Sequence, residues 1–175
     1  RLFIIDGYAV LYRAHYALIR NPLITSYGFH TSALFGFANQ LIKIIKDEKP
    51  DYLVCAFDSK EKTFRHKIYS KYKANRPDMP EELQEQIPHL WELLDGMNIP
   101  VLKKPGFEAD DIIGTITESM SGEEVESYIV SGDKDFMQLI NEKIFLYSPG
   151  KRNASPDIYD REGVINKWGL PPEKI

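Results

Sequence analysis

The stretch GFEADDIIGT places three carboxylates within the four residues from Glu108 to Asp111. Apolar residues follow at the spacing of one helix face, so a helix should begin near Glu108. Acidic side chains are favoured in the first turn of a helix, because they face its unpaired N–H groups and the positive end of its dipole. Taken alone, the stretch therefore indicates a helix cap, and any chemistry there needs support from the rest of the chain.

Further acids stand where three apolar runs end, each run being typical of a buried strand. Asp6 ends RLFIID, Asp58 ends YLVCAFD, and Asp133 and Asp135 follow SYIVSG. In open α/β sheets, function gathers outside the carboxyl ends of the strands. We therefore expect one rim of the sheet to carry the carboxylates of Asp6, Asp58, Glu108, Asp110, Asp111, Asp133 and Asp135.

Crowded carboxylates repel one another unless they are protonated or matched by cations. Lys134 is the exception among strand ends that otherwise lack Lys or Arg. A divalent ion would resolve the repulsion. Mg²⁺ or Mn²⁺ prefers carboxylate and water oxygens, and no cluster of His and Cys indicates zinc. Each acid also has a simpler interpretation: Asp6 could belong to a turn with Gly7, and Asp111 lies about 100° around the helix from Asp110.

Charge is segregated along the chain, although the formal net charge is only −4. Between Lys60 and Arg76 the basic residues face a single acid, Glu61, whereas residues 78–95 contain acids and no Lys or Arg. The basic segment directly follows Asp58, so it should stand on the same rim. Its cations could hold phosphates beside a metal centre, and Tyr69 and Tyr72 could stack on bases. The alternative is a solvated amphipathic helix whose aromatic residues pack on the body.

Apolar runs typical of strands alternate with segments of helical spacing, which favours a mostly parallel sheet with helices on both faces. The length of 175 residues suits one domain, residues 1–175. We expect strands at 1–6, 52–58, 99–103, 127–135 and 143–147, helices at 10–19, 31–45, 80–95 and from 108, and short helices within 134–140 and around Val164. After Ser148 the chain is polar and turn-rich.

No apolar stretch is long enough to cross a bilayer, and no signal peptide precedes the first strand. The sequence does not begin with Met, which suggests trimming and leaves a lost targeting segment open. The single cysteine, Cys55, lies in an apolar run and cannot form an internal disulfide. It is typical of a buried thiol in a reducing compartment.

Four stretches in this order resemble the bacterial 5′→3′ exonuclease or flap-endonuclease family, and most closely the N-terminal nuclease domain of bacterial DNA polymerase I. They are IIDGYAVLYRAHYAL, FDSKEKTFRHKIYSKYKANRPDMP, GFEADDIIGT and VSGDKDFMQL. The resemblance runs from Leu2 to the end of the chain. It implies a PIN-like (resolvase-like) α/β fold with a basic helical-arch insertion at about 60–95. It also implies two clustered Mg²⁺ or Mn²⁺ ions, and cleavage of DNA 5′ flaps, 5′ ends and RNA primers during replication and repair, in the bacterial cytoplasm (nucleoid).

The same resemblance implies roles for individual residues. Asp6, Asp58, Glu108 and Asp110 would hold the first ion, Asp111 would support that site indirectly or through water, and Asp133 and Asp135 would hold the second ion. The residues expected to contact DNA are Tyr12, Arg13, Arg65, Lys67, Tyr72, Lys73 and Arg76, of which Lys73 also counts among the catalytic residues. Tyr12 matches an aromatic residue that stacks near the scissile nucleotide, but it could equally pack in the core.

The family continues beyond this point with a helix–hairpin–helix region that grips duplex DNA and binds a monovalent ion. It also adds further Asp residues to the second metal site. Neither is present in this sequence, so we expect a fragment with an incomplete second site and a weak grip on duplex DNA. A polymerase domain could follow in a full-length chain, and nothing in the sequence indicates an obligate dimer or a membrane partner.

Three other functions fit parts of the pattern. A non-catalytic nucleic-acid binding module would keep the fold and use the acids only for stability. A PIN-type ribonuclease would act on RNA alone, although the basic insertion suits a threaded 5′ flap. An aspartyl phosphotransferase would use the Asp of IIDG, but it needs a second acid soon afterwards, and Tyr8 stands there.

Overall fold

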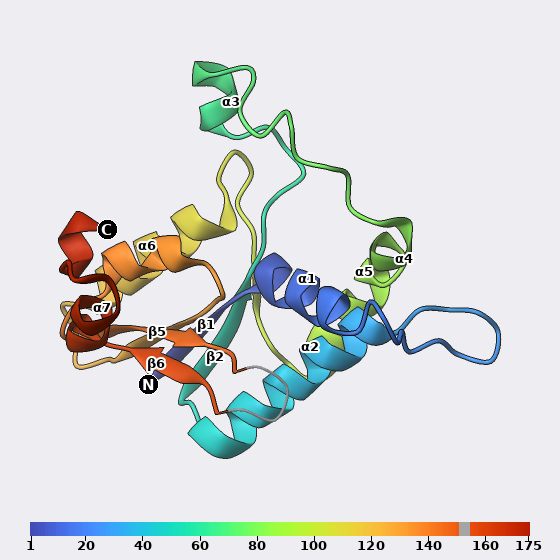
Figure 1. Cartoon of the computed structure of the whole chain (residues 1–175), viewed down its shortest axis with the longest axis horizontal. Coiled ribbons are helices and arrows are strands. Elements are labelled where there is room, and N and C mark those ends of the chain that lie inside the picture. Colours follow the sequence, from blue (N-terminus) through green and yellow to red (C-terminus); the bar gives the residue numbers. More distant parts are fainter. Residues whose placement is uncertain (151–154) are drawn as a thin grey trace.

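A single sheet organises residues 1–150 and 155–175, which are the residues that the computed structural model describes (Figure 1). Its strand order is β3-β2-β1-β4-β5-β6. The first five strands are parallel, and β6 pairs antiparallel with β5. The strands are β1 Leu2–Asp6, β2 Tyr52–Ala56, β3 Val101–Leu102, β4 Ser127–Val130, β5 Ile144–Ser148 and β6 Asp157–Tyr159. The predicted mostly parallel α/β sheet is confirmed.

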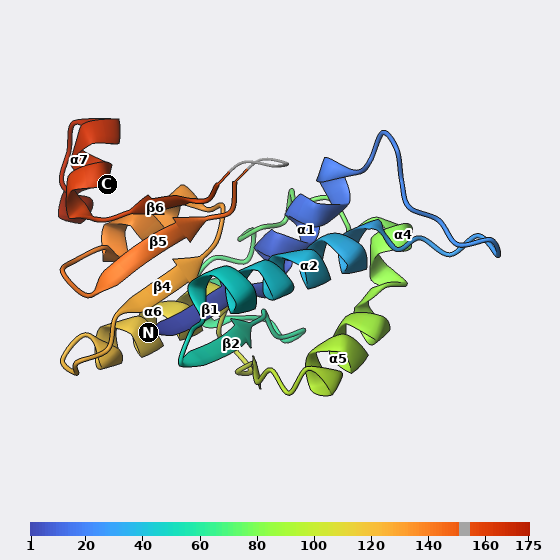
Figure 2. The ribbon, with the colours of Figure 1, turned by 90° about the horizontal axis from the view of Figure 1, so that it is seen from below.

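The central strand β1 is buried along its whole length, because apolar clusters cover both faces of the sheet. Phe3 and Ile5 join the cluster that contains residues of α1 (Gly7–Ala17), α2 (Ser32–Lys43) and α5 (Ile87–Gly96). Leu2 and Ile4 point the other way, into the cluster that contains residues of α6 (Ala109–Met120) and α7 (Arg161–Trp168). Successive strand residues face opposite sides, so an apolar strand such as β1 needs this cover on both faces (Figure 2).

The strand order reverses beside β1. From β1 the chain builds outward through β2 to β3, then crosses back through α6 to β4 on the opposite side of β1. In open α/β sheets the crevice outside the carboxyl ends at such a reversal is the usual place for a site. The carboxyl ends of β1 and β4 therefore mark where the acids should gather.

Two predicted helices differ from those observed. The helix predicted from Pro80 to Asp95 is two helices, α4 (Glu81–Gln84) and α5, with Pro88 in the first turn of the second. Proline lacks the N–H that a helix interior needs, so it begins a helix here instead of lying within one. The first helix begins at Gly7, earlier than the predicted Val10, because the side chain of Asp6 caps it.

The remaining differences are short elements. The segment KDFMQL forms a 3-10 helix, η2 (Lys134–Leu139), and α2 continues into a π-helical turn, η1 (Ile44–Glu48). Strand β6 lies in the tail that was expected to be turn-rich; its three residues are too few to show an alternating pattern. Within the segment of about 60–95 predicted as an arch, α3 (Phe64–Ile68) stands clear of the sheet (Figure 1), whereas α5 buries Leu90 and Leu94 in the core. None of the helices in the described part of the chain has the length and apolar character to span a bilayer.

Candidate metal centre

The carboxyl ends of the central strands bring four predicted acids together. Asp6 ends β1, Asp58 follows β2, and Asp133 follows β4. The charge of Asp110, in the first turn of α6, interacts with all three of them. Asp135 lies beside this group on η2, and its N–H donates to Asp133 Oδ1 at 2.9 Å. The fold therefore gathers onto one rim the acids that the sequence placed there.

Asp6 is almost enclosed by protein. Its carboxylate accepts hydrogen bonds from the Ala9 N–H at 3.2 Å and from the Ser131 hydroxyl at 2.9 Å. Burial raises the pKa of Asp6 because it removes water from the charged form, and these two hydrogen bonds partly offset that effect. Asp6 therefore both begins α1 and points an ionisable group at the rim.

The start of α6 is tied to the neighbouring strand by a carboxylate. Asp58 Oδ1 accepts the Ala109 N–H at 2.7 Å, and Asp111 Oδ2 accepts the Glu108 N–H at 2.9 Å. These bonds satisfy two N–H groups that a helix start leaves without partners. The cap interpretation of EADD is thus correct for Glu108 and Asp111, whose side chains form a capping box, and Asp58 adds a further acceptor from the neighbouring strand.

The basic arch supplies partners for two of the acids. Arg65 donates two hydrogen bonds to Asp111, both of 2.8 Å, from 46 residues away in the sequence. Lys73 Nζ lies 2.7 Å from Glu108 Oε1, and the Tyr72 hydroxyl donates to Glu108 Oε2 at 3.1 Å. The hydrogen bonds from Arg65 are the main reason why the pKa of Asp111 is lowered. These contacts place the basic segment on the rim of the acids, as its position directly after Asp58 predicted.

Asp110 has the opposite electrostatic environment to Asp111. The protein around its carboxyl group displaces water, and the charges of Asp6, Asp58 and Asp133 repel the ionised form, so its pKa rises to about 6. Lys73 offsets this only in part. Net repulsion therefore remains between Asp110 and the three acids at the strand ends.

The donor chemistry fits a hard divalent ion. The clustered side chains are carboxylates, which suit Mg²⁺ or Mn²⁺, and their mutual repulsion would be relieved by added positive charge. Among residues 1–150 and 155–175, however, no three His, Cys, Asp or Glu side chains are arranged to hold an ion as they stand. Glu108 is held by Lys73, so an ion that binds Glu108 would compete with Lys73 for that carboxylate.

The other residues predicted to contact DNA lie around the same rim in different states. Tyr12 is half-buried, packs against the core cluster of α1 and stacks on Tyr16 with ring centroids 6.2 Å apart. Arg13 donates to the backbone carbonyls of Pro149 and Gly150. Lys67 and Arg76 are exposed on the arch. The structure thus leaves these two arch cations facing solvent, while Arg65 and Lys73 contact acids.

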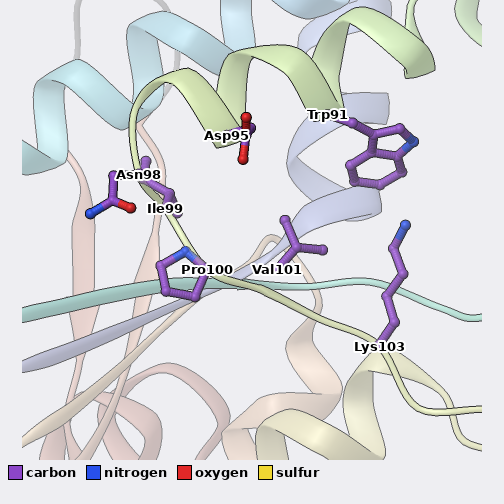
Figure 3. Close-up of a pocket in the computed structure, with 7 residues that line it drawn as sticks. All are labelled: Trp91, Asp95, Asn98, Ile99, Pro100, Val101 and Lys103. Carbon is purple, nitrogen blue, oxygen red and sulfur yellow. The ribbon is translucent and has the colours of Figure 1, made fainter.

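A cavity of about 480 Å³ at the outer edge of the sheet is unrelated to this cluster. It lies between α5 and β3, and Figure 3 shows its lining residues, with Lys103 directed at the ring of Trp91. The Lys103 ammonium lies 3.3 Å from the ring centroid, a cation–π contact. Asp95 is the one acid among the lining residues, so this cavity contains none of the predicted metal ligands.

Sequence reasoning missed the residue that joins two of the acids, Ser131. Its hydroxyl contacts Asp6 and also accepts the Asp133 N–H at 3.0 Å. The available signal was its position in SYIVSGD, one residue beyond a buried strand and two before an acid. Because serine is common in such turns, that position alone does not indicate a role.

A family described as the 5′-3′ exonuclease, N-terminal resolvase-like domain, matches residues 1–169. The chain belongs to this family. It is 42% identical over 174 residues to a 5′-3′ exonuclease of Aquifex aeolicus, covering 99% of this chain and 58% of that protein. It is 41% identical over 176 residues to DNA polymerase I of Bacillus subtilis, covering 100% of this chain and 20% of that protein. The chain thus spans little more than half the length of the exonuclease and a fifth of the length of the polymerase.

Solved structures share the fold. A flap endonuclease of bacteriophage T5, in a pseudo-enzyme-product complex with DNA and metal ions, superposes with a TM-score of 0.70 at 19% identity. The match covers 97% of this chain and 61% of that one. At this identity the likeness shows the PIN-like architecture and assigns no role to a single residue.

Proposed function

We propose that the chain is the nuclease domain of a divalent-metal-dependent, structure-specific 5′→3′ exonuclease or flap endonuclease. It would hydrolyse phosphodiesters in DNA with 5′ flaps or 5′ ends, and in RNA primers. The observation that carries the proposal is the group of mutually repelling acids at the reversal of strand order, Asp6, Asp58, Asp110 and Asp133, set below a basic arch.

The acids would hold the ions as the resemblance assigns them, with Asp6, Asp58, Glu108 and Asp110 at one site and Asp133 and Asp135 at the other. Bound divalent ions would supply hydroxide at neutral pH and stabilise charge on the scissile phosphate. We also propose that the ions are Mg²⁺ or Mn²⁺, which the oxygen-only donor set supports. The number of ions, two, is part of the same proposal.

The chain's own residues would guide the nucleic acid. Lys67 and Arg76 are exposed on the arch and could contact phosphates. Lys73 would exchange its bond to Glu108 for a phosphate, which frees Glu108 at the moment that substrate arrives. Tyr12 lies near Arg76, whose charge lowers the Tyr12 pKa against the larger effect of burial. Its ring would offer a surface on which a base could stack.

The proposal includes partners and a compartment that the observations leave as predictions. The protein would act as a monomer on DNA in the bacterial cytoplasm, and a polymerase domain could belong to the same full-length chain. Buried Cys55, whose pKa burial raises to about 12, is compatible with a reducing compartment because such a thiol is inert.

Cleavage of a 5′-flap DNA by the chain tests this function directly. The assay compares Mg²⁺, Mn²⁺ and a chelator, with Asp58→Asn beside the wild type. Metal-dependent cutting that the variant loses is the expected result. Cutting that persists in chelator, or equally in the variant, would place the chemistry elsewhere.

A non-catalytic nucleic-acid binding module is the second candidate, favoured by the absence of a preassembled three-carboxylate site in the described residues. The two candidates differ in metal linkage. A nuclease centre binds Mn²⁺ only when folded, so its melting temperature rises with Mn²⁺ concentration. A binding module in which arch cations satisfy the acids would melt at the same temperature with Mn²⁺ or chelator.

A further inference from the structure

Ser131 stands at the reversal of strand order, between the two strands that carry acids at their ends. The register pairs Ile5 of β1 with Val130 of β4, so Ser131 is the next residue along and lies beside Asp6. It is fully buried, and its own N–H continues the ladder to Tyr147 on β5 at 3.3 Å. Its backbone is therefore fixed by the sheet, and its hydroxyl has little freedom.

The direction of its hydrogen bonds follows from the groups around it. The Asp133 N–H can only donate, so the Ser131 oxygen accepts there, at 3.0 Å. The single hydroxyl proton is then directed to Asp6 Oδ2, at 2.9 Å. A serine hydroxyl has one proton to donate. The Ser131 side chain therefore accepts from the backbone of Asp133 and donates to the carboxylate of Asp6.

These bonds constrain both acids. Asp6 is held through both oxygens, by Ser131 and by the Ala9 N–H, while each oxygen keeps a further lone pair. Asp133 is held through its backbone, and its Oδ1 accepts the Asp135 N–H. The chain of contacts Asp6–Ser131–Asp133–Asp135 thus spans acids assigned to two different ions.

We infer that Ser131 is a positioning residue that fixes Asp6 relative to Asp133 and so sets the spacing of the two ion sites. It touches neither ion nor substrate. This inference rests on the proposed function, because it concerns the same acids. Groups that orient metal ligands in this way are commonly worth about 10–100-fold in metal affinity.

Ser127 provides a matched control on the same strand. It begins β4, at the end remote from the acids, and is 1% exposed. Its hydroxyl is buried without a hydrogen-bond partner in the described part of the chain. Removing this hydroxyl should change burial on β4 as much as removing that of Ser131, without affecting any acid.

The experiment measures Mn²⁺ affinity of the purified chain by calorimetry, beside its melting temperature in chelator. Ser131→Ala should bind Mn²⁺ at least about tenfold more weakly than the wild type. Ser127→Ala should bind as the wild type does. Ser131→Thr, which restores a hydroxyl donor, should recover the affinity.

The outcomes separate this inference from the proposed function. Unchanged affinity in Ser131→Ala, or an equal loss in Ser127→Ala, overturns the inference while the metal centre stands. A wild type that binds no Mn²⁺ overturns both. If Ser131→Ala does not fold, Ser131→Cys replaces it, because a thiol of similar size is a weak donor. If Ser131→Cys then binds Mn²⁺ as tightly as Ser131→Thr, the inference is overturned. If Ser131→Cys binds Mn²⁺ more weakly, the inference is supported.

Discussion

Two neighbouring residues, Asp110 and Asp111, experience opposite electrostatic environments. Asp111 is paired with Arg65 through two hydrogen bonds, and its pKa is lowered. Asp110 faces the strand-end acids, and its pKa is raised to about 6. The roughly 100° between successive residues on a helix turns one toward the arch and the other toward the sheet.

The difference divides the acid cluster into two halves. The arch neutralises the outer half, Glu108 and Asp111, from within the chain. Nothing among the described residues neutralises the inner half to the same degree, so the folded protein retains repulsion there. Repulsion of this kind persists where a cation is supplied from outside, and functional sites commonly hold such perturbed groups. The comparison therefore identifies the inner half, Asp6, Asp58, Asp110 and Asp133, as the place where a bound cation would relieve the most repulsion.

The largest expected effect is on cleavage. Asp58→Asn keeps an acceptor for the Ala109 N–H but removes charge from the inner half, so flap cleavage should fall about 10³-fold or more. Asp111→Asn removes charge from the outer half, which acts only indirectly, and should cost about 10–100-fold. Single-turnover rates with saturating Mg²⁺ measure both. Equal losses in the two variants would erase the distinction between the halves.

The next effect is on the stability of the metal-free protein, where the two substitutions should differ in sign. Asp110→Asn relieves repulsion and should stabilise the fold by about 0.5–1 kcal/mol, a value reduced by solvent screening. Asp111→Asn breaks a paired contact and should destabilise it by about 1–2 kcal/mol. Urea unfolding in chelator at pH 8 measures both. Destabilisation by Asp110→Asn would show that this carboxylate is already matched.

The pH dependence carries the same signs. Asp110 binds its proton more tightly when folded, so its contribution to stability is greatest below about pH 4 and declines as the pH rises to about 6. Asp111 binds its proton less tightly when folded, so its contribution is present above the unfolded pKa and is lost as the pH falls through the lowered one. Asp110→Asn should remove the first trend and leave the second.

The sequence predicted the rim but not its two halves. Apolar runs ending in acids determine the sheet and place Asp6, Asp58 and Asp133 at one edge, because parallel strands share their carboxyl ends. The pairing of Arg65 with Asp111 depends on how a 46-residue separation closes in space, which local pattern does not encode. Ser131 was missed for the same reason, since its partners lie on another strand and in the following turn. The helix start at Pro88 and the cap at Asp6 were local signals that were overlooked.

A smaller effect should appear in the binding of flap DNA. We propose that Lys73 leaves Glu108 and contacts a phosphate when DNA binds. Lys73→Ala removes this contact, so the plot of log affinity against log salt concentration should become less steep by about 1. Lys46 is exposed on η1, remote from the acids at the opposite ends of the strands. Lys46→Ala should leave the slope unchanged. Fluorescence anisotropy in Ca²⁺ over a range of KCl measures both, and an unchanged slope for Lys73→Ala would mean that its partner stays Glu108 when DNA binds.

The smallest effect concerns the mobility of the arch, from Thr63 to Pro80, in the absence of DNA. Its apolar side chains are largely in solvent, with Ile68 80% exposed and Tyr69 58% exposed, so little buried surface opposes local opening. The arch is tied to the acids only by the polar contacts of Arg65, Tyr72 and Lys73. Arch amides should therefore exchange hydrogen much faster than those of β1 and β4. Saturating Mn²⁺ should make arch exchange faster still, because an ion that takes Glu108 leaves Lys73 without its partner. Slower exchange with Mn²⁺ would instead mean that the metal and the arch cations bind the acids together, and the two halves of the cluster would then act as a single site.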